Sequence, residues 1–159
     1  MNITVIAPGK IKEKYFSDAI EEYKKRLGRY GKIEISELKD EPTPDNPSKR
    51  EKELILEKEG RRIKEKLPQG SFLVALCVEG KQKSSEELAE LFKSVPLGGK
   101  SRITFVIGGS LGLSEEIKAA ADLRLSFSKM TFPHQLMRVI LLEQVYRAFT
   151  ICEGKTYHK

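Results

Sequence analysis

The pattern of apolar and polar positions divides the chain into alternating strands and helices. Short runs rich in β-branched residues, either continuous or alternating with polar residues, predict strands at 2–7, 32–38, 72–77, 103–107 and 123–127. Helical spacing and capping residues predict helices at 13–27, 48–67, 88–94 and 133–153, with a short one after Ser114. This alternation predicts an α/β fold: one domain over residues 1–159, with a mostly parallel sheet and helices on both faces.

Two expectations concern single elements. The helix at 48–67 is highly charged and has few apolar positions, so we expect it to lie on the outside of the fold. Glu79-Gly80-Lys81 follows the buried run 72–77 and is typical of a turn that ends that strand.

The two loops that follow the last two strands carry unusual residues. Gly108, Gly109 and Gly112 follow the strand at 103–107 but form neither a G-x-G-x-x-G motif nor a P-loop, so phosphate binding is weakly supported. The loop at 126–132 mixes aromatic and sulfur-containing side chains with hydroxyls, which suits a ligand with an apolar ring and polar edges. Because ligands bind at the carboxyl ends of strands in such sheets, we expect a pocket here. A plain turn and a loop anchored by its aromatics remain the alternatives.

The helix at 133–153 is apolar around most of its circumference. A helix of this kind is buried on more than one side, and in a chain this small the second side favours a partner subunit, hence a homodimer. A central core helix is the alternative. His134 and Arg138 lie on it, and the tail that follows gathers Tyr157 and His158 in a segment that would otherwise be a frayed end.

Composition and charge narrow the class of protein. Hydrophobic residues make up 39% of the chain and charged residues 33%, and no apolar run approaches membrane-spanning or signal-peptide character. The two cysteines, Cys77 and Cys152, are far apart and typical of reduced packing residues, so we expect a cytoplasmic protein with no membrane contact. The net charge of +6 comes from the two ends of the chain, which favours an RNA partner; solvated helix faces are the alternative.

Four segments carry a resemblance to a known family. They are GKIKEKYFSDAIEEYKKRL near the start, FVIGGSLGL, LSFSKMTFPHQLMRVILLEQVYRAF and the terminal YHK. Together they resemble the RlmH (YbeA-like) family of SPOUT-class methyltransferases of large-subunit ribosomal RNA, over essentially the whole chain. The resemblance implies a trefoil knot near the carboxyl terminus, which spacing alone would not suggest. It also implies a homodimer with its cofactor sites at the subunit interface.

The resemblance also implies a reaction and a set of site residues. S-adenosylmethionine would methylate N3 of a pseudouridine in a stem-loop of the large-subunit ribosomal RNA, on assembled ribosomes. The cofactor-binding residues implied by similarity are Leu76, Gly108, Phe127, Ser128, Lys129, Met130, Thr131 and Phe132. The catalytic candidates are His134, Arg138, Tyr157 and His158, and the sequence does not decide which one, if any, accepts the N3 proton. No metal is expected, because the sulfonium already activates the methyl group.

Two other functions remain open from the sequence. One is a non-catalytic RNA- or ribosome-binding protein that keeps the fold. The other is a nucleotide-binding oxidoreductase. The sequence argues against it, because it has neither a G-x-G-x-x-G motif nor a ribose-binding acid after such a motif.

Overall fold

The computed structural model describes the whole chain, Met1–Lys159, and contains one five-stranded sheet. Its strands are β1 Asn2–Pro8, β2 Ile33–Leu38, β3 Phe72–Gln82, β4 Arg102–Ile107 and β5 Leu123–Ser126. Its helices are α1 Lys14–Leu27, α2 Lys49–Lys66, α3 Ser85–Leu97, α4 Glu115–Ala120 and α5 His134–Cys152. The strand order is β2-β1-β4-β3-β5, and every pair is parallel, which confirms the predicted parallel α/β sheet.

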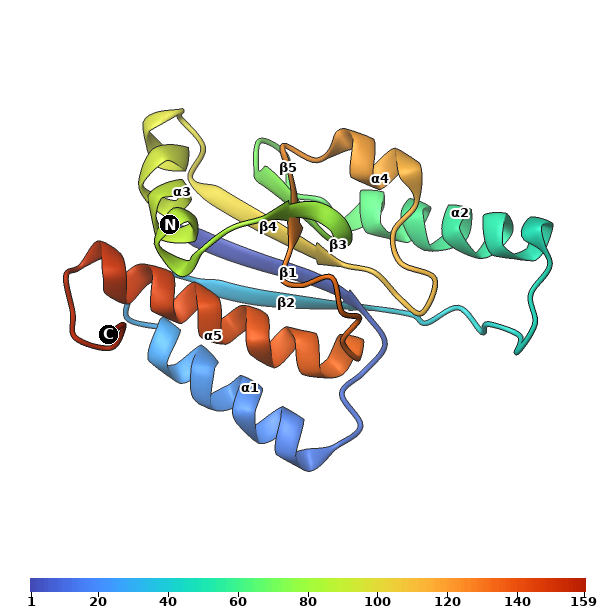
Figure 1. Cartoon of the computed structure of the whole chain (residues 1–159), viewed down its shortest axis with the longest axis horizontal. Helices are drawn as coiled ribbons and strands as arrows, with labels where there is room; N and C mark the ends of the chain where they lie inside the picture. The colour runs from blue at the N-terminus through green and yellow to red at the C-terminus, as the bar shows by residue number, and fades with distance from the viewer.

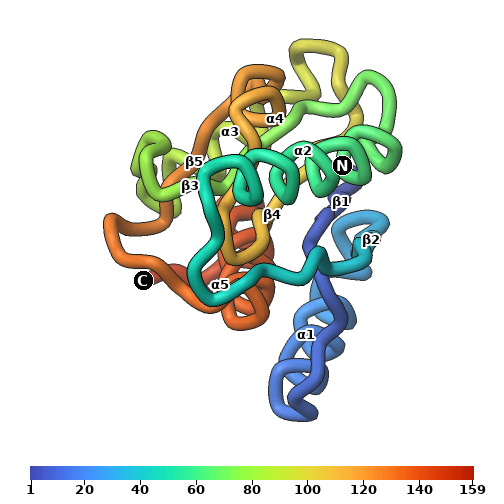
Figure 2. The backbone as a smooth tube through the Cα atoms, turned by 90° about the vertical axis from the view of Figure 1, so that its right-hand side faces the viewer, coloured from blue at the N-terminus to red at the C-terminus, as the bar shows by residue number.

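Helices cover both faces of the sheet (Figures 1 and 2). Alternate residues of β1 point to opposite faces, so Ile3 and Val5 join one apolar cluster while Ile6 joins another. The larger cluster lies under α1, α3 and α5, and the smaller one lies under α2 and α4. Charged α2 buries only one side, as expected for an outer helix. No helix combines the length and the apolar character needed to cross a membrane.

The expected turn at 79–81 is wrong, because β3 continues through it to Gln82. The ladder between β3 and β5 shifts its register between Leu76 and Lys81, so β5 pairs with β3 on both sides of an irregularity. Gly80 lies in that irregularity, where an added Cβ would come 2.8 Å from a backbone carbon of Leu125. The glycine therefore marks a close approach of two backbones rather than the end of a strand.

The strand order brings three carboxyl ends together. β4, β3 and β5 are neighbours, so the loops that follow β4 and β5 lie beside the second half of β3. Strand order alone does not define a knot, so the trefoil knot expected near the carboxyl terminus stays a prediction.

Candidate functional site

A pocket of about 460 Å³ lies at the carboxyl ends of β3, β4 and β5. Its walls come from the second half of β3, the glycine loop 108–112, the loop 127–133 and the first turn of α5. The residues implied as cofactor-binding that line it are Leu76, Gly108, Phe127, Ser128, Met130, Thr131 and Phe132. Lys129 is exposed and is not part of the lining. His134 lines the pocket at the start of α5.

The glycine loop is a tight turn that only glycine can form at two positions. Gly112 has a φ of +79°, and its N–H donates a hydrogen bond to the carbonyl of Gly109 at 3.0 Å. An added Cβ at Gly108 would lie 2.5 Å from the carbonyl carbon of Gly112, inside van der Waals contact. The turn therefore presents bare backbone to the pocket. The two alternatives predicted from the sequence, a plain turn and a pocket wall, are both true of these residues.

The loop after β5 is held by its own hydroxyls. Ser126 donates to the carbonyl of Ser128 at 3.0 Å, and the N–H of Met130 donates to the Ser128 hydroxyl at 3.0 Å. Phe127 packs against the larger apolar cluster, whereas the Met130 side chain is 73% exposed at the pocket. The loop is thus anchored by one aromatic residue while its sulfur-containing side chain stays available to a ligand.

An ion pair in the pocket wall was not foreseen from the sequence. Lys118 of α4 donates to Glu79 at 2.7 Å and to Glu115 at 2.5 Å, and its side chain is only 13% exposed. The hydrogen bond from Lys118 lowers the pKa of the Glu79 carboxyl, and those to Glu115 and Glu79 raise the pKa of Lys118. The sequence predicts a strand that ends at Cys77, followed by a turn that contains Glu79. Because β3 continues to Gln82, Glu79 instead lies on the strand beside the pocket.

Arg138, a catalytic candidate from the sequence, lies in the core and not in the pocket. It is 1% exposed and donates to the carbonyls of Pro8 and Gly9 and to the Glu37 carboxylate at 3.3 Å. Burial lowers the pKa of its guanidinium, and Glu37 opposes that effect. Arg138 therefore ties α5 to the ends of β1 and β2. Its catalytic role stays a prediction.

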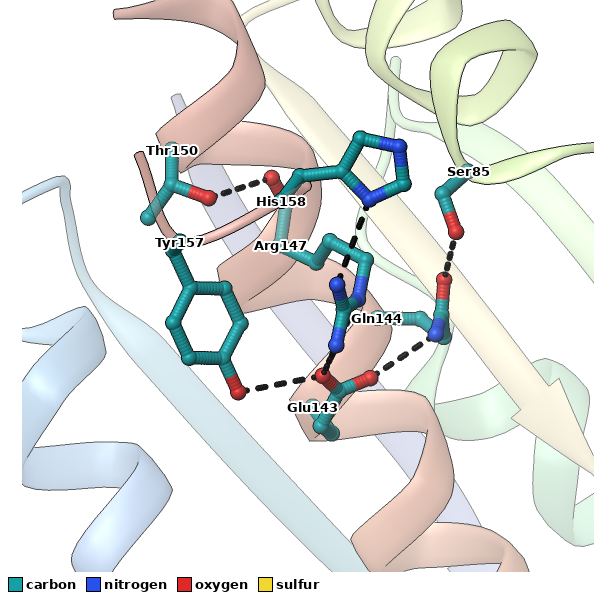
Figure 3. Close-up of polar contacts among 7 residues, drawn as sticks. All are labelled: Ser85, Glu143, Gln144, Arg147, Thr150, Tyr157 and His158. Atoms are coloured by element: carbon teal, nitrogen blue, oxygen red, sulfur yellow. Dashed lines mark hydrogen bonds and ion pairs between the residues drawn. The ribbon is translucent and has the colours of Figure 1, made fainter. Parts of the chain in front are cut away.

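The two other catalytic candidates lie in a second cluster, at the carboxyl-terminal end of the chain (Figure 3). The tail folds back along α5, where the Tyr157 hydroxyl donates to Glu143 at 3.1 Å and its ring packs edge-on against Tyr146. Arg147 donates to Glu143 at 2.5 Å and to Nδ1 of His158 at 3.2 Å. The reading of this tail as a frayed end is therefore wrong.

Hydrogen bonds and burial act together within this tail cluster, which comprises Glu143, Arg147, Tyr157 and His158. Burial, with the nearby Glu143 carboxylate, raises the pKa of Tyr157 to about 12, so its phenol stays protonated and donates. Nδ1 of His158 accepts from Arg147 while Nε2 lies 2.7 Å from Glu86, which fits the neutral imidazole with its proton on Nε2. Hydrogen bonding to Glu143 raises the pKa of Arg147.

The pocket and the tail cluster are separated within one chain. Met137 lines the pocket, and Arg147 lies ten residues further along α5, or about 15 Å at 1.5 Å per residue. The structure thus does not bring His134 and His158 to one place in a single chain. The sequence reasoning missed Glu143 and Arg147 as members of a site, although an acid and a base four apart on a strongly apolar helix are a signal.

The comparisons with known proteins agree with this geometry. A family model described as "Predicted SPOUT methyltransferase" matches residues 1–158. The ribosomal RNA large subunit methyltransferase H of Clostridium novyi (strain NT) is 58% identical over 159 residues, and that of Clostridium beijerinckii is 57% identical, each covering 100% of both chains. The crystal structure of a tRNA methyltransferase from Aquifex aeolicus covers 100% of this chain and 74% of its own, with a TM-score of 0.53 at 14% identity, a likeness of fold alone. These findings confirm the resemblance seen in the sequence: the chain belongs to the SPOUT methyltransferase family.

Proposed function

We propose that this protein is an S-adenosylmethionine-dependent methyltransferase of large-subunit ribosomal RNA that methylates N3 of a pseudouridine on assembled ribosomes in the cytoplasm. The observation that carries the proposal is the pocket at the carboxyl ends of β3, β4 and β5, built from seven of the eight residues that the family resemblance implies. Full-length relatives more than half identical to this chain are named ribosomal RNA large subunit methyltransferase H, which supports the substrate class. The whole chain, 1–159, acts as one domain in this proposal.

The pocket residues fit S-adenosylmethionine. A volume of about 460 Å³ lies in the range of sites for ligands of this size. Apolar side chains such as Leu76, Phe127 and Phe132 suit an adenine ring, and bare backbone at Gly108 permits close approach. The Glu79–Lys118 pair supplies opposite charges for the ammonium and carboxylate of the methionine part. When bound, the cofactor supplies a methyl group on a sulfonium, whose sulfur is the leaving group.

The outward side of α5 supports the homodimer that we propose. Leu136 and Ile140 are apolar and only half-buried, and they pack against neither core cluster of their own chain. With Glu143 and Arg147 they form one stripe, since the spacing of four, three and four residues returns to the same side of a helix. We propose that this stripe packs on its twin around a two-fold axis perpendicular to α5, an arrangement in which the two α5 helices are antiparallel.

Antiparallel packing joins the two separated parts of the site. A two-fold axis near Ile140 would set the pocket end of each α5 beside the tail end of the other, so each pocket receives the tail cluster of the partner subunit. The hydroxyl of Tyr157 and the guanidinium of Arg147 then bind and orient the RNA base and its phosphate. His158 is the proposed acceptor of the N3 proton, once Arg147 releases its Nδ1. His134 of the pocket is the alternative acceptor.

Methyl transfer to ribosomes tests the proposed function. Purified ribosomes lacking the modification are incubated with the protein and S-adenosylmethionine labelled in its methyl group, and the labelled nucleoside is identified after digestion of the RNA. We expect label in N3-methylpseudouridine of the large-subunit RNA. Ribosome binding without any transfer of label would instead support the non-catalytic RNA-binding alternative.

Mixed dimers test which chain each tail serves. One chain lacks residues 157–159, and the other carries Gly108→Val, whose side chain would clash with the backbone of Gly112 and distort the glycine loop of its pocket. If each tail serves the pocket of the partner subunit, the mixed dimer contains one site with an intact pocket from one chain and an intact tail from the other, so activity partly returns. If each tail serves its own pocket, every site in that heterodimer lacks one part and the mixture stays inactive.

A further inference from the structure

The glycine loop has a second neighbour on the side away from the pocket. Gly109 lines the pocket and also lines a void of about 10 Å³ together with Glu59 of α2. An added Cβ at Gly109 would lie 3.1 Å from both carboxyl oxygens of Glu59, so the carboxyl faces the glycine directly. Glu59 is only 8% exposed, although it belongs to the most charged helix of the chain. A buried carboxyl thus forms the back wall of the loop.

Close packing holds Glu59 in this place. The next residue, Gly60, lies so near α4 that an added Cβ would meet the Ser114 hydroxyl oxygen at 2.9 Å. On the loop itself, the hydroxyl of Ser110 makes a hydrogen bond of 3.0 Å with Thr43, in the segment before α2. The α2 side of the fold therefore meets the glycine loop at two points: the Glu59 carboxyl faces Gly109, and Thr43 bonds to Ser110.

No cation forms an ion pair with the Glu59 carboxyl. Arg62, one turn further along α2, donates to the carbonyl of Lys39 at 3.0 Å and pairs with Glu41 at 2.9 Å. Lys58 also pairs with Glu41, at 3.3 Å. Arg62 and Lys58 are thus both engaged by one other carboxylate. Lys39 also lines the void but makes no ion pair with Glu59, so Glu59 forms no salt bridge.

Burial and the nearby carboxylates favour the uncharged form of Glu59. Burial raises the pKa of this carboxyl to about 7, the nearby carboxylates of Asp40 and Glu41 add to that rise, and Arg62 opposes it. The glycine loop and the end of β1 at Pro8 bring no charged group to the void. Near neutral pH the carboxyl is therefore divided between an uncharged form that tolerates burial and an ionised form that does not.

We propose that Glu59 is a positioning residue whose uncharged carboxyl holds Gly109 from behind and keeps the glycine loop in the shape that accepts the methyl donor. This inference rests on the proposed function of the pocket. Ionisation favours a side-chain conformation that turns the carboxylate toward water, since burying a charge without a partner is costly. The loop then loses its back wall, and the pocket loses affinity for its ligand. Binding of the donor and protonation of Glu59 are thus coupled.

Calorimetric titration with S-adenosylhomocysteine, the demethylated product, tests the coupling between pH 6 and pH 8. If only the protonated form binds and the pKa is about 7, the competent fraction and hence the affinity fall about tenfold over this range. Glu59→Gln keeps the shape without the charge, so at pH 8 it should bind about tenfold more tightly than the wild type, and equally at pH 6. The exposed neighbour variant Glu57→Gln is the matched control and should follow the wild type. Groups of the ligand titrate identically in all three proteins and cancel in the comparison.

Two further measurements decide between outcomes. Titrations in buffers of different ionisation enthalpy should show nearly one proton more taken up by the wild type than by Glu59→Gln at pH 8. Glu59→Ala, which removes the back wall, should bind weakly at both pH values. Parallel pH profiles for the wild type and Glu59→Gln overturn the inference while leaving the proposed function intact. A wild-type protein that binds no S-adenosylhomocysteine at any pH overturns the proposed function itself.

Discussion

Glu59→Gln should also stabilise the protein, in a manner that depends on pH. The Glu59 carboxyl has a pKa raised from 4.5 to about 7 in the folded chain. Between these values the folded state holds a proton that the unfolded state has lost, so the free energy of unfolding falls as pH rises from about 4.5 to about 7. Well above pH 7 both states are ionised and the loss is constant. The amide of the variant does not titrate, so the variant avoids this loss.

The size of the effect follows from the shift. A shift of about 2.5 pKa units corresponds to about 3 kcal/mol at 1.36 kcal/mol per unit, an upper bound because the amide must find its own hydrogen-bond partners. The variant should therefore be about 2–3 kcal/mol more stable than the wild type at pH 8, and nearly equal to it at pH 4.5. For a chain of this length that difference raises the melting temperature by roughly 4–12 °C.

Urea unfolding at pH 4.5, 6, 7 and 8, followed by circular dichroism at one fixed protein concentration, measures the difference. Glu57→Gln, which removes an exposed pair with Arg61, should stay within about 0.5 kcal/mol of the wild type throughout. A gap between Glu59→Gln and the wild type that is the same at every pH would show that the carboxyl does not titrate between these values. A variant less stable than the wild type at pH 8 would show that ionised Glu59 is well paired, and the reasoning would fail.

Three further outcomes follow from the structure. Gly108→Val places a branched side chain against the carbonyl of Gly112, so calorimetry should show no binding of S-adenosylmethionine while the dimer is retained; unchanged affinity in a folded variant would remove Gly108 from the pocket. Sedimentation at micromolar concentration should give twice the chain mass of 18.0 kDa, and Ile140→Glu should shift it toward the monomer; a monomeric wild type active on ribosomes would contradict the proposed dimer. Arg138→Met should lower the free energy of unfolding by about 3 kcal/mol, since it leaves two carbonyls and Glu37 without their donor; a stability near that of the wild type would argue against its tying role.

The helices and strands were predictable from the sequence because their apolar residues recur at regular helical or strand spacing. β4 is a continuous apolar run and α1 carries apolar residues at helical spacing, so local sequence and tertiary structure agree there. The prediction failed at Gly80, where a glycine after an apolar run has two readings, a turn and a close approach of backbones. The second reading depends on β5, more than forty residues later in the chain, which no local pattern contains.

The candidate site was predictable where it follows the ends of strands. Glycines after β4 and aromatic residues after β5 both indicated the pocket, because parallel topology brings these ends together. Arg138 and Glu59 show the limit of that reasoning. Each is a buried charged residue on a helix that also carries other charged residues, and only the packing of that helix decides which charge is buried. The resemblance to a family indicated chemistry at the tail but not the partners that hold it.

The tail cluster explains how charged groups and the proposed subunit interface can share one helix. Glu143 and Arg147 neutralise each other, the phenol of Tyr157 stays protonated, and His158 has the partners of a neutral ring. The cluster therefore presents hydrogen-bonding groups with little net charge, and burying such a set against a partner costs far less than burying a single unpaired ion. In the proposed dimer this lets the apolar and polar halves of the α5 stripe lie in one interface. Arrival of an RNA base at the partner subunit's pocket would then exchange the bonds among these four side chains for bonds to the base, so association and catalysis use the same groups in turn.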